Sequence, residues 1–205
     1  MKKILIFDFD GVVVDSFDLC MDVYLRSCKR NGYYVIKSKK HLLEMMEVNL
    51  FESLIKLGLT KEDIGKIVKG TSEERLISKE PKMFAGMKKI LEKLSQDNIM
   101  YIVTSTPGKS VKNTLKFYGL DAYFKDVYGP EKSPSKIKKL NFIKTKHKDN
   151  IYFFISDTVG DIAEGNEAGV ETVAVSWGWH NKAKLLKVSP KYFVEKPGDL
   201  LKLFK

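Results

Sequence analysis

The chain has 205 residues, of which 43% are hydrophobic and 11% aromatic, a composition that supports a folded core and argues against disorder. Its formal net charge is +10, yet the only arginines are Arg26, Arg30 and Arg75, and the lysines are scattered along the whole chain. Because arginine is the preferred residue for reading phosphates and bases, we interpret the charge as a solvated lysine-rich surface and expect no nucleic-acid partner.

No apolar run approaches the roughly 20 residues of a membrane span. The apolar start of the chain is interrupted by Asp8 and Asp10 and lacks a cleavage site, so we expect neither a signal peptide nor a membrane partner, and a cytoplasmic location. Cys20 and Cys28 fall in one predicted helix, about 12 Å apart at roughly 1.5 Å per residue, which is too far for a disulfide.

In chain order, the first predicted element is a strand over residues 4–9, whose continuous apolar run is typical of a buried parallel strand. Residues 16–81 are predicted to be mostly helical. A first helix covers residues 17–31 and stops at Gly32, a second starts at Ser38, and a third covers residues 49–57. Thr60 and Asp63 have the spacing of a capping box for a fourth helix.

After Pro81 the pattern changes to alternating helices and strands. Helices are predicted near residues 87–94, 111–118 and 162–168, and strands at 99–103, 151–155, 172–176 and 192–194. Such alternation implies a doubly wound parallel sheet. We therefore predict an α/β protein in which residues 1–15 and 82–205 form the sheet domain and residues 16–81 form a helical insert.

Two carboxylates, Asp8 and Asp10, end the first strand, at the edge where open α/β sheets bind ligands. Acids this close repel each other unless a cation or a proton lies between them, so they indicate a metal, a covalent nucleophile, or both. Three further signals follow in order along the chain: Thr104 at a strand end, a lysine (Lys132 or Lys136) near the head of a helix, and the pair Asp157 and Asp161 after the strand at 151–155.

This ordered set resembles the haloacid dehalogenase superfamily, and within it the small phosphoglycolate-phosphatase-like members. The run from Asp161 to Gly169 is similar to the family's D-x-x-A-A-x-x-A-G helix, and the likeness covers nearly the whole chain. The resemblance implies a Rossmann-like core, with the helical insert as a small cap that closes over the substrate.

The resemblance also implies the site residues and a Mg²⁺ cofactor. Asp8 would be the nucleophile that forms an aspartyl-phosphate, and Asp10 the general acid and then base. Mg²⁺ would be bound by Asp8, the backbone carbonyl of Asp10 and Asp157, with Asp161 as a ligand or just beyond the ligands. Thr104 and one lysine would hold the phosphoryl oxygens.

Two positions for that lysine stay open. Lys136 is favoured because Leu140 and Ile143 follow it at helical spacing, and the segment resembles the family's G-S-P-x-x-K form. Lys132 precedes Ser133 and resembles the K-P-x-P form. His41, His147 and His180 are interpreted as structural or surface residues, although His180 follows a strand end and could line the mouth of the site.

We expect a Mg²⁺-dependent phosphatase that acts on a small phosphorylated metabolite. Family members that dehalogenate lack the second aspartate, so Asp10 favours phosphoryl transfer. Two alternatives remain: a phosphomutase of the β-phosphoglucomutase type, and a non-catalytic binding protein. The natural substrate and the oligomeric state stay open at this point, and a monomer is compatible with the size of the predicted core.

Overall fold

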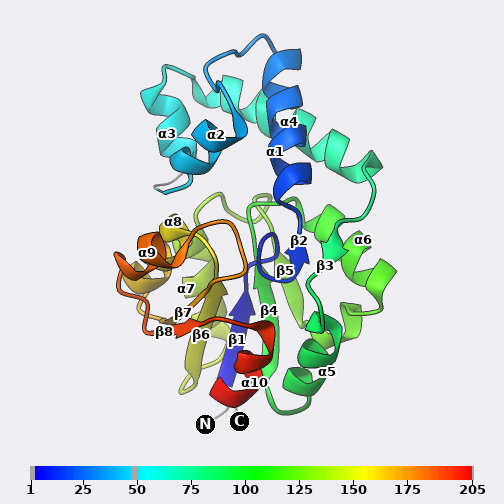
Figure 1. Cartoon of the computed structure of the whole chain (residues 1–205), viewed down its shortest axis with the longest axis vertical. Helices are drawn as coiled ribbons and strands as arrows, with labels where there is room; N and C mark the ends of the chain where they lie inside the picture. The colour runs from blue at the N-terminus through cyan, green and yellow to red at the C-terminus, as the bar shows by residue number, and fades with distance from the viewer. Residues whose placement is uncertain (1–2, 48–49, 205) are drawn as a thin grey trace. The chain divides into compact units, whose positions relative to one another are not determined.

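The computed structural model describes residues 3–47 and 50–204, and the chain divides into two compact units (Figure 1). The first, called the core unit below, comprises Met1–Asp15 and Pro81–Lys205; the second, the helical unit, comprises Ser16–Glu80. The second boundary thus falls before Pro81, whereas the sequence pattern placed it after that residue. In the described part of the chain, no helix is long and apolar enough to cross a membrane.

The core unit is built on a six-stranded sheet in which every pairing is parallel, in the order β5-β4-β1-β6-β7-β8. β1 lies in the middle, with Ile4 opposite Ile99 of β4 and Lys3 opposite Ile151 of β6. The strands are β1 (Lys3–Phe7), β4 (Ile99–Val103), β5 (Asp126–Tyr128), β6 (Ile151–Ser156), β7 (Glu171–Val175) and β8 (Tyr192–Val194).

Helices cover both faces of this sheet (Figure 1). Leu5 and Phe7 of β1 pack with α5 (Met87–Asp97), α6 (Gly108–Tyr118) and α10 (Leu200–Leu203). Ile4 and Ile6 face the other side and pack with α7 (Lys136–Lys146) and with Ala168 and Val170, which follow α8 (Val159–Glu167). Because successive residues of a strand point to opposite faces, a strand covered on both sides must be apolar throughout, which explains its continuous apolar run.

The predicted α/β fold with a doubly wound parallel sheet is confirmed. The remaining core elements are short and were not predicted: β5, the 3₁₀ turns Asp121–Tyr123 and Pro197–Asp199, α9 (Lys182–Leu186), and an antiparallel ribbon of β2 (Val14–Asp15) and β3 (Lys82–Met83). Helix α8 begins earlier than its apolar spacing indicated, because the Thr158 hydroxyl caps it by accepting the Asp161 N–H.

The helical unit holds α1 (Phe17–Arg30), α2 (Lys39–Met45), α3 (Leu50–Lys56) and α4 (Lys61–Ile77). The predicted capping box is present, since Thr60 and Asp63 each accept a backbone N–H from the other. The third helix was predicted from Asn49, which lies outside the described residues. Glu74 of α4 is buried and pairs with Arg26 and Arg30 of α1. Both cysteines lie on α1 and are free thiols.

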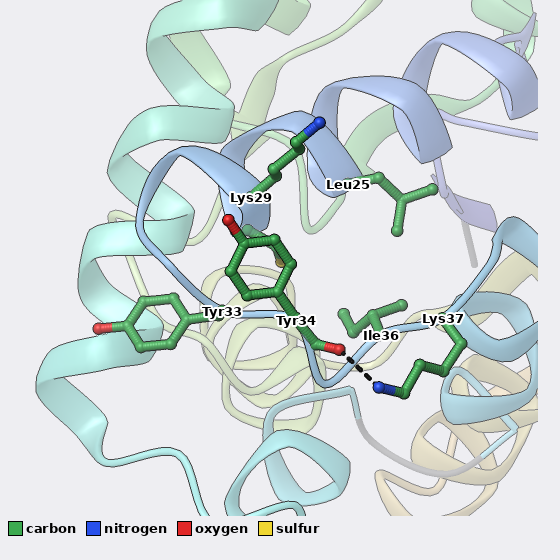
Figure 2. A pocket seen from close by; sticks show the side chains of 7 residues that line it. Leu25, Lys29, Tyr33, Tyr34, Ile36 and Lys37 are labelled. Carbon is green, nitrogen blue, oxygen red and sulfur yellow. Dashed lines mark hydrogen bonds between the residues drawn. The ribbon is translucent and has the colours of Figure 1, made fainter.

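An open groove of about 470 Å³ follows the end of α1 within the helical unit (Figure 2). On one side of it, the Lys37 ammonium donates to the Tyr34 carbonyl oxygen. Burial raises the pKa of the Cys28 thiol in its wall to about 11, so this thiol stays protonated and unreactive at neutral pH. The groove is lined by Leu25, Cys28, Lys29, Tyr33, Tyr34, Ile36 and Lys37, none of which belongs to the acidic motifs.

Candidate active site

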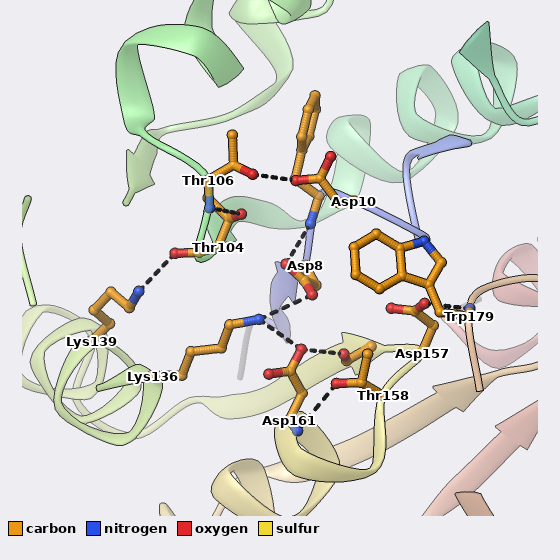
Figure 3. A network of polar contacts seen from close by, with 12 residues as sticks. Asp8, Asp10, Thr104, Thr106, Lys136, Lys139, Asp157, Thr158, Asp161 and Trp179 are labelled. Carbon is orange, nitrogen blue, oxygen red and sulfur yellow. Dashed lines mark hydrogen bonds and ion pairs between the residues drawn. The ribbon is translucent and has the colours of Figure 1, made fainter. Parts of the chain in front are cut away.

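Polar side chains gather at the carboxyl ends of three neighbouring strands of the core unit (Figure 3). Asp8 directly follows β1, Thr104 follows β4, and Asp157 follows β6. Lys136, the first residue of α7, reaches the same place. Because β4 and β6 flank β1, residues far apart in the sequence meet at this edge of the sheet.

Asp8 and Asp161 are bridged by one ammonium group. Lys136 Nζ lies 3.0 Å from Asp8 Oδ2 and 2.6 Å from Asp161 Oδ2, and all three side chains are buried. Burial raises the pKa of Asp8 well above its usual range, although Lys136 opposes that rise. Burial works against the charge of Lys136 as well, but the two carboxylates outweigh it and raise the pKa of the ammonium. The lysine therefore stays charged and neutralises part of the acidic cluster.

The chain itself makes further hydrogen bonds to both carboxylates. The second oxygen of Asp8, Oδ1, accepts the Phe9 N–H at 2.7 Å, and Asp161 Oδ2, which already faces Lys136, also accepts the Ser156 hydroxyl at 2.7 Å. Despite its burial, Asp161 has a pKa held well below the usual range, chiefly by Lys136. Asp161 is thus a fixed anion beside the lysine.

Among Asp8, Asp10, Asp157 and Asp161, only Asp157 has a fully buried oxygen without a hydrogen-bond partner in the described chain. Its Oδ2 accepts the Trp179 N–H at 2.7 Å, whereas its Oδ1 is buried and has no hydrogen-bond partner among the described residues. Burial raises the pKa of this carboxyl to about 7. A Cβ on Gly11, which has a φ of +77°, would overlap Asp157 Oδ2, and one on Gly178 would overlap the same side chain. The chain therefore comes close to Asp157 where only glycine fits.

A hard cation suits this carboxylate, because Mg²⁺ prefers oxygen ligands and would satisfy the buried Asp157 Oδ1. Within the described ranges 3–47 and 50–204, however, no three His, Cys, Asp or Glu side chains form a metal-binding group. The physical reason is that Asp161 faces Lys136 and Ser156, and the Asp10 carboxylate faces Thr106. Asp157 is thus the carboxylate with an oxygen left for a cation; Asp8, whose oxygens face Lys136 and the Phe9 N–H, would have to share one of them, and the other positions would belong to backbone carbonyl, water and substrate oxygens.

The loop after β4 connects Thr104 to Asp10. Thr104 Oγ1 accepts the Thr106 N–H at 3.0 Å, and the Thr106 hydroxyl donates to Asp10 Oδ2 at 2.6 Å. Lys139 Nζ donates to the Thr104 carbonyl oxygen at 2.7 Å. The hydroxyl of Thr104 still carries a proton that it can donate to an anion.

The two lysines left open by the sequence lie in different places. Lys136 is buried against Asp8, whereas Lys132 is exposed, pairs with Asp126 at 3.4 Å and lies over the Tyr128 ring. His180 is buried, and its ring nitrogen Nδ1 accepts the Val159 N–H at the start of α8. This histidine holds the loop after β6 in shape.

Several residues of the site were not singled out from the sequence. Thr106 holds Asp10, Ser156 holds Asp161, the Trp179 N–H holds Asp157, and Lys139 holds Thr104. Two signals could have pointed to some of them: Thr106 closely follows Thr104, and Lys139 lies three residues after Lys136 on the same face of a helix.

The carboxyl end of the parallel sheet thus holds a carboxylate paired with a lysine and, beside it, a carboxylate with an unsatisfied buried oxygen, an arrangement that suits an enzyme acting on an anionic substrate. The chain belongs to the haloacid dehalogenase-like hydrolase family, whose sequence model matches residues 5–175. It is 26% identical to a pyrophosphatase PpaX of Bacillus mycoides, over 96% of this chain and 94% of that protein. It is 22% identical to a phosphoglycolate phosphatase of Vibrio parahaemolyticus, over 98% of this chain and 95% of that protein.

Solved structures show the same fold. A haloacid dehalogenase-like hydrolase from Streptococcus pneumoniae superposes with a TM-score of 0.79 and 25% identity, covering 100% of this chain and 99% of that one. These likenesses extend over both units of the chain, so the family assignment covers the helical insert as well as the sheet.

Proposed function

We propose that the protein is a Mg²⁺-dependent phosphatase that hydrolyses a small phosphate monoester through an aspartyl-phosphate on Asp8. The observation that carries this proposal is the pairing of the buried Asp8 carboxylate with Lys136, beside the unsatisfied oxygen of Asp157. Two relatives named as a pyrophosphatase and a phosphoglycolate phosphatase support phosphate chemistry for this chain.

Asp8 and Asp10 have separate roles in the reaction. Asp8 attacks phosphorus, and the bond from phosphorus to the leaving oxygen breaks while Asp10 gives that oxygen its proton. In the second half, Asp10 takes a proton from the attacking water, phosphate leaves and Asp8 regains its carboxylate. The Thr106 hydroxyl, at 2.6 Å from Asp10 Oδ2, keeps that carboxylate aimed during both proton transfers.

Charge stabilisation falls to the remaining side chains. Lys136 carries the positive charge beside Asp8, and Asp161 together with Ser156 holds this ammonium in place. The Thr104 hydroxyl donates to a phosphoryl oxygen. When bound, Mg²⁺ would be held by Asp8, Asp157 and the Asp10 carbonyl, and it would offset negative charge on the phosphoryl group. The role of Asp161 in this proposal is to position Lys136 instead of binding the cation.

The helical unit is the part of the chain that we assign to substrate selection. Along the chain it begins after β2 and ends before β3. It thus lies between β1, which Asp8 follows, and β4, which Thr104 follows. A small helical insert at this point would act as a cap that excludes bulk water and limits the substrate to a small metabolite.

The proposal is tested with an aryl phosphate, with Mg²⁺ and then with EDTA. Asp8→Asn is expected to lower kcat by about a thousandfold or more, because the amide is not a nucleophile. Asp97→Asn, the same change at an exposed aspartate, is the matched control and should keep full activity. Lys136→Met should also abolish most turnover, while Lys132→Met should change kcat by less than about twofold, because Lys132 is exposed.

The products separate the phosphatase from its alternatives. A phosphatase releases inorganic phosphate steadily, whereas a phosphomutase isomerises a sugar phosphate and needs a bisphosphate primer. Full activity of the Asp8→Asn variant would exclude Asp8 as the nucleophile and overturn the proposed mechanism. No Mg²⁺-dependent turnover of any phosphate ester would instead leave a binding protein as the remaining function.

A further inference from the structure

Lys139 is a second buried lysine that the mechanism above does not use. Its side chain is 2% exposed, and it lies on α7 three residues after Lys136. Residues at this spacing occupy the same face of a helix, so both ammonium groups approach the carboxyl end of the sheet from one direction (Figure 3). Lys138, between them, is exposed.

The ammonium of Lys139 is joined to the site by a chain of hydrogen bonds. Its Nζ donates to the Thr104 carbonyl oxygen at 2.7 Å, Thr104 Oγ1 accepts the Thr106 N–H, and the Thr106 hydroxyl donates to Asp10. Lys139 thereby holds the loop at residues 104–106, and this loop in turn contacts Asp10, the acid–base aspartate of the proposed mechanism.

A charge in this position is costly for a purely structural role. Burial, and the nearby charge of Lys136, lower the pKa of Lys139 to about 8, against the pull of Asp8, Asp161 and Glu164. A methionine would fill the same volume without that cost. An anion bound beside Lys136 would favour the charged form of Lys139, so phosphate binding and protonation of this lysine would reinforce each other.

We propose that Lys139 is a positioning residue of the phosphate site: it fixes the loop at residues 104–106 through the Thr104 carbonyl and adds a second buried positive charge behind Lys136. The inference rests on the proposed phosphatase function for the identity of the anion. Its expected signature is a phosphate affinity that depends on the protonation of Lys139.

The test measures binding of inorganic phosphate by calorimetry, and kcat/KM for an aryl phosphate, between about pH 7 and pH 9.5. Lys139→Met is expected to weaken phosphate binding about tenfold and to lower kcat/KM roughly 10-fold to 100-fold at neutral pH. Lys138→Met removes the same charge from an exposed position of the same helix and should change neither quantity. Circular dichroism checks that each variant is folded.

The pH profile separates this role from simple packing. Wild-type affinity for phosphate should fall as the pH rises above about 8, whereas Lys139→Arg should keep its affinity because a guanidinium stays protonated there. The inference would be overturned if Lys139→Met bound phosphate with the affinity and the pH dependence of the wild type. It would also be overturned if the Met and Arg variants lost phosphate affinity equally while the pH dependence stayed that of the wild type. If phosphate affinity depends on the protonation of Lys139 but no phosphate ester is hydrolysed, the phosphatase proposal fails and the proposal of an anion site stands.

Discussion

Lys139 should also affect the stability of the core unit. Its buried charge lowers the free energy of unfolding, whereas the burial of most side chains raises it. Its pKa lies at about 8 in the folded protein, against an ordinary value of 10.5, with burial as the largest cause. Between these two values the unfolded chain keeps the proton and the folded chain releases it. The free energy of unfolding therefore rises with pH over this window, and below about pH 8 the full cost of the buried charge is present.

The magnitude follows from the difference between the two pKa values. At about 1.4 kcal/mol per pH unit, lowering the pKa from 10.5 to about 8 corresponds to about 3 kcal/mol in total. Lys139→Met has no proton to release. The free energy of unfolding of the wild-type protein, relative to that of this variant, should thus rise by about 1.4 kcal/mol for each pH unit above about 8.

Urea unfolding followed by tryptophan fluorescence measures this gain. Both tryptophans, Trp177 and Trp179, belong to the core unit, so their signal reports the unit that contains Lys139. Groups that titrate in both proteins cancel in the difference between wild type and variant. Lys138→Met serves as the control, and its difference from wild type should stay flat. A pH-independent difference for Lys139→Met, or one that falls as the pH rises, would refute the reasoning.

Three further predictions concern the same edge of the sheet. Thr106→Val should lower kcat for an alkyl phosphate about tenfold more than for an aryl phosphate, since only the poorer leaving group needs the proton from Asp10, and Thr106→Ser should restore the rate. Gly11→Ala should lower the urea midpoint more than Gly86→Ala: both glycines have a φ of +77°, but only a Cβ on Gly11 meets Asp157. Asp157→Asn should raise the Mg²⁺ concentration for the half-maximal change in tryptophan fluorescence by about tenfold or more; an unchanged midpoint would remove Asp157 from the metal site.

The fold could be predicted from local patterns because its central elements are signalled locally. The apolar run before Asp8 reflects burial on both faces of the sheet, and the Thr60 capping box depends on residues three apart. Strand β5 could not be predicted in this way. It has three residues, and what makes it a strand is its pairing with Tyr101 and its neighbours in β4, a contact distant along the chain.

Part of the candidate site could likewise be predicted from local patterns in the sequence, and part could not. Asp8, Thr104 and Asp157 end predicted strands, so their meeting at one edge follows from the parallel topology. The choice between Lys132 and Lys136 depends on where α7 begins, and the Ser135 hydroxyl sets this point by accepting the Lys138 N–H.

Contacts between loops left no such signal. The hydrogen bond from Thr106 to Asp10 joins residues 96 positions apart, and it depends on side-chain conformations that no periodicity encodes. The approach of Gly11 to Asp157 is set in the same way, by the path of two loops.

The antiparallel ribbon of β2 and β3 has a consequence for how this chain could change over evolution or by design. Val14 pairs with Met83 and Asp15 with Lys82, so the chain leaves the core and returns to it at neighbouring points. Everything between these pairs is, for the core, one long hairpin loop, and the entropic cost of closing a loop grows only slowly with its length. We therefore expect that residues 16–81 can be exchanged for a shorter or longer insert without changing the register of the six-stranded sheet.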